Sequence, residues 1–210
     1  FPYTTLFRSA VRTAGLSAVA ALRLARPDAS VAAFIGCGVQ ARSHLQVLIE
    51  LFPIKQVCAF ARSAASREAF CDFAENLGLM VMNCTSAQQA MRGADVVVTS
   101  VTLSPQLVPF LDACWLKPGV FVTMTDLAVS WLAESLSVID RIYVDDRDQE
   151  ASMSKPLVNP GLVQGDLSDL VTGKVVGRET VHERTAFVFR GLALGDLAVA
   201  GLAYQRALGL

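Results

Sequence analysis

The sequence predicts an α/β protein with a doubly wound parallel sheet. Short apolar runs alternate with segments of helical pattern along most of its 210 residues. Such alternation is typical of strand–helix–strand units, in which the strands are parallel and the crossovers right-handed. Residues 95–101 are almost continuous in valine, as expected for a strand that is buried on both faces.

The expected elements follow one another with recognisable starts and stops. Pro27 ends the first helix, Ser63 caps the helix after the second strand, and Gly78 ends that helix. Asp166 caps a short helix late in the chain, after a stretch (152–165) that we expect to be a surface connection. The predicted strands are 31–35, 54–60, 79–84, 95–101, 120–124 and 141–144, and the predicted helices are 10–26, 40–51, 63–77, 86–91, 129–136, 166–170 and 192–208.

The last of these helices is apolar on nearly all sides, so we expect it to be buried or to lie at an interface. No apolar run approaches the ~20 residues that span a bilayer. The 18 basic and 19 acidic residues are interspersed and give a formal net charge of −1. This balance argues against nucleic-acid and membrane partners.

Cysteine usage points to a reducing compartment, so we expect a cytoplasmic protein. The number of cysteines is odd and none forms a C-x-x-C pair, which favours free, buried thiols. With only two histidines, the sequence offers no zinc site. The cysteines are Cys37, Cys58, Cys71, Cys84 and Cys114.

A glycine motif, G-x-G-x-x-A, joins the first strand to the next helix. Gly36 permits a tight turn, Gly38 lets a pyrophosphate approach the backbone, and Ala41 lets the helix pack close to the strand. The phosphates would then lie at the helix N-terminus, beside Val39 and Gln40, where free N–H groups and the helix dipole favour anions. An ordinary turn is the alternative, but the flanking strand and helix favour a dinucleotide site.

The end of the second strand bears on the choice of cofactor. An Asp or Glu there usually binds the ribose 2′-hydroxyl of NAD. This chain instead has Arg62 and Ser63, with Arg67 nearby, which favours the 2′-phosphate of NADP(H). Alternatively, Arg62 is a solvated surface charge.

Polar residues after two other strands are candidates for the chemistry. Thr99, Ser100 and Val101 end the fourth strand, where they would contact the nicotinamide half or simply close the strand. Asp126 follows the fifth strand and would serve either as a general acid/base or as the N-cap of the next helix.

Four further charged residues allow less specific interpretations. We expect Asp145 and Asp146 to be solvated and Asp196 to have a structural role in the first turn of the last helix. Arg12 is suited to binding a carboxylate bidentately, or it is an ordinary surface charge.

The beginning of the chain carries a separate prediction. Residues 1–9 match one reading frame of a common sequencing adapter, so we expect them to be a translated artefact and exclude them from the fold. We then expect a helix of the substrate domain at 10–27, a dinucleotide-binding domain at 28–165, and a C-terminal segment at 166–210 that returns towards the substrate domain.

Together, several motifs resemble the ornithine cyclodeaminase/mu-crystallin family over residues 10–207. The resemblance implies a homodimer with a Rossmann domain and a second substrate/dimerisation domain, of which this chain would keep remnants because it lacks the N-terminal half. It also implies that Arg12 binds the substrate carboxylate and that Asp126 is catalytic. The motifs are Arg12-Thr13-Ala14, 24–29, 36–42, 93–97, 115–119 and 187–196.

The family resemblance implies hydride transfer at the Cα of a small amino or imino acid, of the cyclodeaminase, ketimine reductase or amino-acid dehydrogenase type. Two departures count against ornithine itself. In ornithine cyclodeaminases the catalytic aspartate is followed by Pro-Gly-Lys-Thr-Glu, whereas in this chain Asp126 is followed by Leu-Ala-Val-Ser-Trp at residues 127–131. The ribose acid of the NAD-using cyclodeaminases is also missing. The alternatives are a non-catalytic, NADP-binding mu-crystallin-like protein and a piece of an enzyme that only binds cofactor.

Overall fold

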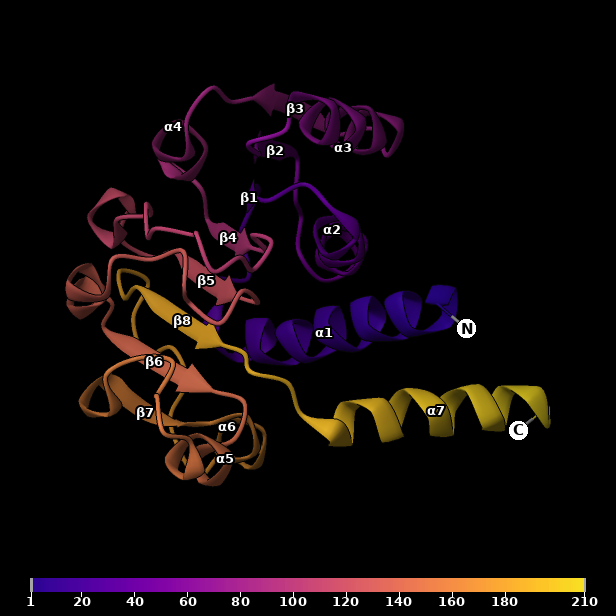
Figure 1. The fold of residues 1–210 in the computed structure, drawn as a ribbon, viewed down its shortest axis with the longest axis vertical. Helices are drawn as coiled ribbons and strands as arrows, with labels where there is room; N and C mark the ends of the chain where they lie inside the picture. The colour runs from indigo at the N-terminus through magenta and orange to yellow at the C-terminus, as the bar shows by residue number, and fades with distance from the viewer. Residues whose placement is uncertain (1, 210) are drawn as a thin grey trace.

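Eight parallel strands form a single sheet at the centre of the protein. The computed structural model describes the backbone of residues 2–209 and the side chains of residues 10–209. The strands are β1 Val31–Ile35, β2 Gln56–Phe60, β3 Met80–Asn83, β4 Val96–Thr99, β5 Phe121–Met124, β6 Arg141–Val144, β7 Val163–Asp166 and β8 Thr185–Val188. Their order in the sheet is β3-β2-β1-β4-β5-β8-β6-β7 (Figure 1), which confirms the predicted fold class.

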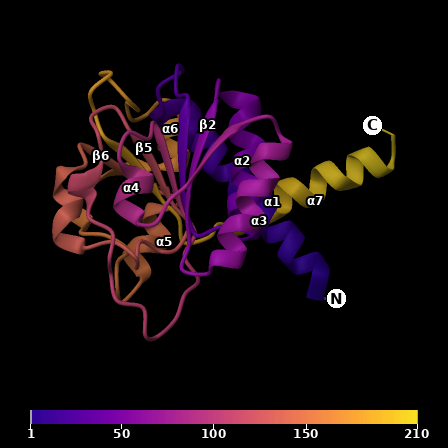
Figure 2. The same cartoon turned by 90° about the horizontal axis from the view of Figure 1, so that it is seen from above.

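Helices cover both faces of this sheet. One core lies under α1, α2, α3 and α6, and the other lies under α4, η1 and η2. Figure 2 shows α2 and α3 on one side of the sheet and α4 on the other. The helices are α1 Pro2–Leu24, α2 Val39–Leu51, α3 Ala64–Asn76, α4 Ala87–Met91, α5 Arg147–Ser152, α6 Leu167–Thr172 and α7 Ala193–Ala207, with 3-10 turns η1 Ala113–Trp115, η2 Ala133–Val138 and η3 Pro160–Leu162.

The chain changes direction across the sheet at β1. From β1 it moves outward to β2 and β3, then returns to β4 on the other side of β1 and continues to β5. The carboxyl ends of β1 and β4 therefore lie side by side with their connections leading apart. Such a switch point is where open α/β sheets form their ligand crevice.

Two strands were missed by the sequence prediction. β7 begins at Val163, within the stretch expected to be a surface connection, and β8 inserts between β5 and β6. Each has only four residues, so the local pattern is short and the pairing partners are distant in sequence. The sheet consequently extends past residue 165, the expected boundary of the dinucleotide-binding domain.

The α-helix predicted at 129–136 is wrong. Leu127 and Ala128 have left-handed backbone angles (φ 58° and 56°), and only a 3-10 turn follows at 133–138. Trp131 is instead buried, and its backbone pairs with Leu111 in an isolated parallel bridge. Burial of the indole in the core thus overrides the local helical pattern. By contrast, the predicted caps Ser63 and Asp166 are confirmed.

A series of buried hydrogen bonds between side chains connects α1 to α2 and to β5. The Nδ1 atom of His44 donates to the carbonyl of Gln40 (2.8 Å), which can only accept. The Nε2 atom then accepts from the Ser17 hydroxyl (3.0 Å), which also bonds Thr123 (2.9 Å). Burial lowers the pKa of His44 to about 4, so the ring is neutral at pH 7 and α1 is positioned by uncharged hydrogen bonds.

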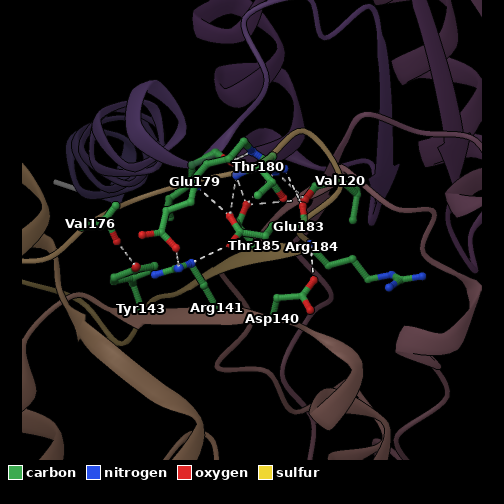
Figure 3. A network of polar contacts seen from close by, with 12 residues as sticks. Val120, Asp140, Arg141, Tyr143, Val176, Glu179, Thr180, Glu183, Arg184 and Thr185 are labelled. Atoms are coloured by element: carbon green, nitrogen blue, oxygen red, sulfur yellow. Dashed lines mark hydrogen bonds and ion pairs between the residues drawn. The ribbon is translucent and has the colours of Figure 1, made fainter.

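A second polar network closes the amino ends of β5, β6 and β8 (Figure 3). Arg178 donates to the carbonyls of Leu24 (2.7 Å) and Val120 (2.9 Å), which ties the end of α1 to the start of β5. Arg141 pairs with Glu179 and Glu183. These contacts tie together segments at the amino ends of the strands, at the opposite end from the crevice beside β1 and β4.

Both ends of the chain lie on one side of the molecule (Figures 1 and 2). Helix α1 begins earlier than predicted, at Pro2; the side chains of residues 1–9 lie outside the described part, so the adapter hypothesis stays a prediction. Helix α7 extends away from the sheet and is not buried in this chain. It exposes large side chains at Leu194, Leu197, Leu202 and Tyr204, and Leu208, which directly follows the helix, is also exposed.

Two sequence predictions concern the whole described chain. All five cysteines are free, as predicted, but Cys114 is exposed whereas the other four are buried. Across residues 2–209, we find no helix that combines the length and the apolar character needed to cross a bilayer.

Candidate functional site

The glycine motif forms a tight turn directly after β1. Gly36 has φ +93°, a region that side chains disfavour, and its N–H donates to the carbonyl of Phe60 at the end of β2 (2.9 Å). A Cβ atom at Gly36 would lie 2.5 Å from the backbone oxygen of Ser100. Only glycine therefore allows the β1 turn to pack against the end of β4.

The second half of the motif leaves room for a ligand. Gly38 precedes α2, and a Cβ atom there would meet no protein atom within 4 Å. No side chain caps this helix N-terminus, so its first N–H groups are available to an anion. Ala41 is fully buried against the sheet, as its small size predicts.

A cleft of about 260 Å³ opens at the switch point between β1 and β4. The Oε1 atom of Gln40 is buried there without a hydrogen-bond partner among the described residues. The cleft thus combines open backbone at Gly38 with an uncapped helix N-terminus, and both features fit the pyrophosphate of a dinucleotide. Its walls are Gly38, Val39, Gln40, Ser100, Val101, Thr102 and Thr125.

Asp126 lies beneath one end of this cleft, at the carboxyl end of β5. Its Oδ1 atom accepts from Thr99 Oγ1 (3.0 Å), and its Oδ2 atom accepts from Ser130 Oγ (2.7 Å) and Val101 N (3.4 Å). Only 2% of the residue is exposed. The cleft residues Val101 and Thr125 are its neighbours, but Asp126 does not itself line the cleft.

The N-cap alternative for Asp126 is wrong, because no helix begins there and its side chain accepts from Thr99, Ser130 and Val101 instead of from N–H groups of a following helical turn. Burial raises the pKa of Asp126, and the hydrogen bonds from Ser130, Thr99 and Val101 oppose that shift. The carboxyl group therefore has a proton affinity above the ordinary aspartate value while it stays fixed in orientation.

The residues predicted to select the cofactor lie at the end of β2. Arg62 and Ser63 are both exposed, and Arg62 has no hydrogen bond or ion pair with the described residues. Ser63 caps α3 through its hydroxyl oxygen, whose proton remains free to donate. Arg67 is occupied by Asn83 and by the carbonyl of Ala61.

Arg12 lies on α1 and contacts Phe189, the residue after the carboxyl end of β8. Its Nη1 atom pairs with Asp196 Oδ2 on α7 (2.8 Å), and its guanidinium carbon lies 5.7 Å from the centre of the Phe189 ring. Phe189 directly follows Val188, which pairs with Met124 of β5. Arg12 and Asp126 are thus associated with the carboxyl ends of neighbouring strands, and Arg12 is no solvated surface charge.

The prediction that Asp145 is solvated is wrong. Asp145 is 2% exposed and accepts N–H bonds from Arg190 (3.1 Å) and Gly191 (2.7 Å), and burial raises the pKa of its carboxyl group. The insertion of β8 beside β6 brings these N–H groups to it, which the sequence did not indicate. Asp146 is half-buried and caps α5.

Sequence reasoning does not find Ser130, Phe189 or Thr125. In the sequence Ser130 stands out only as a departure from a family motif, although its i+4 spacing from Asp126 is a weak signal. A larger cavity, about 540 Å³, lies between α5, α6 and β7 and contains none of the predicted site residues.

The fold and this cleft define a Rossmann-type α/β domain with a buried carboxylate and an arginine at the carboxyl edge of its sheet. A family model described as "Ornithine cyclodeaminase/mu-crystallin family" matches residues 4–210. The chain therefore belongs to the ornithine cyclodeaminase/mu-crystallin family.

Relatives with names or structures support this placement. The ketimine reductase mu-crystallin of Mus musculus is 31% identical over 201 residues, which cover 94% of this chain and 62% of that protein. The Thermococcus litoralis Δ1-pyrroline-2-carboxylate reductase, solved with NADH and L-proline, has a TM-score of 0.85 and 27% identity, over 97% of this chain and 66% of that one. An archaeal alanine dehydrogenase, solved as a dimer with bound NAD, has a TM-score of 0.83 and 30% identity, over 97% and 65%. This chain spans about three fifths of the length of its curated relatives.

Proposed function

We propose that this chain is the dinucleotide-binding part, and one side of the substrate site, of a nicotinamide-dependent enzyme. It would transfer a hydride at the Cα of a small amino or imino acid. The observation that carries the proposal is the cleft that runs from the glycine turn at Gly38 to the strand ends above Asp126. Relatives named for ketimine, pyrroline-2-carboxylate and alanine chemistry support the same substrate class.

Each part of the site has a distinct role in this proposal. The backbone at Gly38 and the free N–H groups in the first turn of α2 hold the pyrophosphate. Arg12 binds the carboxylate of the substrate, and Asp126 holds or releases the proton at the imine nitrogen or its attacking water. The bound nicotinamide supplies or accepts the hydride.

We favour a reductase or dehydrogenase over a cyclodeaminase. The test is to supply NADPH with a cyclic imino acid, or with pyruvate and ammonium, and to follow the reduced nicotinamide. We expect one NADPH to be oxidised for each molecule of imino or keto acid that is reduced. Conversion of ornithine to a cyclic product without net change in the nicotinamide would instead establish lyase chemistry and contradict our choice.

A second candidate function is dinucleotide binding without turnover. One observation favours it: both oxygens of Asp126 are already occupied by internal donors. In that case NADPH would bind saturably, and no imino or keto acid would be reduced.

We further propose that the cofactor is NADP(H). Arg62 and Ser63 provide a cation and a hydroxyl at the end of β2, where no carboxylate is present to bind a free ribose 2′-hydroxyl. The two solved relatives contain NADH and NAD, not NADP(H). The proposed preference is therefore a property of this chain's own residues.

Replacing Arg62 with alanine is expected to weaken NADPH binding by about 10- to 100-fold, because a charged hydrogen bond to the 2′-phosphate is lost. NADH binding should stay within about twofold. Fluorescence titration of the reduced nicotinamide measures both affinities. Arg92→Ala, which removes an exposed arginine after α4, is the matched control and should change neither. Equal loss of NADH and NADPH affinity in the Arg62 variant would contradict the assignment.

We propose that the protein acts as a homodimer in the cytoplasm. The exposed leucines of α7 form an apolar surface that a second subunit or further chain would cover. The dimeric archaeal alanine dehydrogenase supports this arrangement.

A further inference from the structure

The guanidinium of Arg12 has an ion-pair partner on one side and none among the described residues on the other. Its Nη1 atom pairs with Asp196 Oδ2 on α7 at 2.8 Å. Among the described residues, this is the only ion pair between α1 and α7. Its Nε atom is buried and has no hydrogen-bond partner in the described part of the chain. No partner of Nη2 lies within that part either.

Two neighbours fix the plane and the reach of this side chain. The Phe189 ring, only 4% exposed, lies 5.7 Å from the guanidinium carbon. On the α7 side, a Cβ atom at Gly195 would lie 2.8 Å from Arg12 Cγ. The absence of a side chain at Gly195 therefore lets α7 come close enough for Asp196 to reach Nη1.

The unpaired Nε/Nη2 edge has the hydrogen-bond donors that match a carboxylate. The N–H groups of Nε and Nη2 point in the same direction and form a fork that matches the two oxygens of a carboxylate. Elsewhere in this protein, Arg190 binds a carboxylate in this way: its Nε and Nη2 atoms donate to the two oxygens of Glu150, at 2.9 and 3.2 Å. A buried Nε–H without a partner is unfavourable, so a bidentate acid at this edge would satisfy it.

The Asp196 pairing contributes little as a stabilising contact. The side chain of Asp196 is 53% exposed, and ion pairs with one solvated member add little to stability. Its clearer effect is on orientation, because it occupies Nη1 and leaves the Nε/Nη2 edge as the remaining fork.

We propose that Asp196 is a positioning residue: it holds Arg12 so that the Nε/Nη2 edge receives the carboxylate of the substrate. The inference rests on the proposed function and adds a residue from the last helix to the substrate site. Helix α7 then takes part in substrate selection, since Asp196 reaches Arg12 only while α7 stays against α1.

The test compares Asp196→Asn with Asp196→Glu, using pyruvate as the probe and pyruvamide as its neutral counterpart. Binding to the NADPH-loaded protein is followed by quenching of nicotinamide fluorescence, and the KM for pyruvate is measured with ammonium present. We expect Asp196→Asn to weaken pyruvate binding and raise KM by about tenfold, with NADPH affinity unchanged and kcat within about threefold. Asp196→Glu should recover part of the loss. The preference for pyruvate over pyruvamide should shrink in the asparagine variant.

Two controls separate positioning from mere packing of α7. Leu16→Ala loosens the contact between α1 and Gly195 without touching the ion pair, and Asp72→Asn makes the same charge change on α3. An equal rise in KM with Leu16→Ala, or no change with Asp196→Asn, would overturn the inference. If the unaltered protein binds NADPH but neither pyruvate nor a cyclic imino acid, the proposed function itself fails, which is a different result.

Discussion

Replacing Asp126 with asparagine is expected to lower kcat by about 10²- to 10⁴-fold, the usual contribution of a positioned general acid or base. Asparagine has a similar size but cannot take up and release the proton. NADPH affinity should be nearly unchanged, because Asp126 lies beneath the cleft rather than on its wall. Steady-state kinetics with a cyclic imino acid and a fluorescence titration provide the two measurements.

The pH dependence gives the same prediction a second readout. Burial raises the pKa of Asp126, so the proton that it exchanges is lost at a higher pH than from a solvated aspartate. If the ionised form is the active base, kcat/KM should fall as the pH drops through this raised pKa. If the protonated form is the acid, activity should fall as the pH rises through it. In either case, this pH-dependent fall in activity (the limb of the pH profile) should be absent in Asp126→Asn.

Ser130→Ala is the matched control, since it removes the 2.7 Å hydrogen bond but keeps the carboxylate. It should raise the pKa of Asp126 further and shift the limb upward in pH, with a smaller loss of kcat. Full activity in Asp126→Asn would refute the catalytic assignment and favour the non-catalytic, dinucleotide-binding alternative.

Replacing the two motif glycines with alanine is expected to affect different properties: the stability of the fold at Gly36 and the binding of the cofactor at Gly38. At Gly36, φ is +93° and the added Cβ would lie 2.5 Å from the Ser100 oxygen, so Gly36→Ala should lower the free energy of unfolding by about 3 kcal/mol or more. At Gly38, φ is −88° and the space is open, so Gly38→Ala should change stability by only about 0.5 kcal/mol.

The affinity for NADPH, in contrast, should fall specifically in Gly38→Ala. The Cβ atom at Gly38 would occupy the space proposed for the pyrophosphate, so NADPH affinity should fall by at least about tenfold in a fully folded protein. Urea unfolding and nicotinamide titration separate the two effects. NADPH affinity in Gly38→Ala equal to that of the unaltered protein would place the pyrophosphate elsewhere, and an unchanged unfolding midpoint in Gly36→Ala would contradict the steric argument.

Much of the fold could be predicted because its signals are local. The glycine turn and the caps at Ser63 and Asp166 depend on residues within a few positions of one another, and each was found where expected. The apolar runs identified six of the eight strands. In the same way, the spacing of Gly36 and Gly38 predicts a tight turn between the first strand and the next helix, and the structure has this turn between β1 and α2.

The errors lie where distant segments meet. The pattern at 129–136 favours a helix, but burial of Trp131 against the core requires a turn with left-handed residues. Strand β8 has only four residues, although the apolar run at 186–189 was a signal that could have revealed it. Its insertion beside β6 buries Asp145, which by sequence was expected to be solvated.

By itself, the sequence determined the α/β class, the glycine turn and the family resemblance, since these follow from residue type and short spacing. Only the tertiary structure decided the order of the strands, the burial of Asp126 beneath the cleft and the pairing of Arg12 with Asp196, 184 positions away. The physical reason is that burial, proton affinity and guanidinium orientation depend on neighbours in space. Those neighbours come from segments whose separation along the chain carries no signal of their contact.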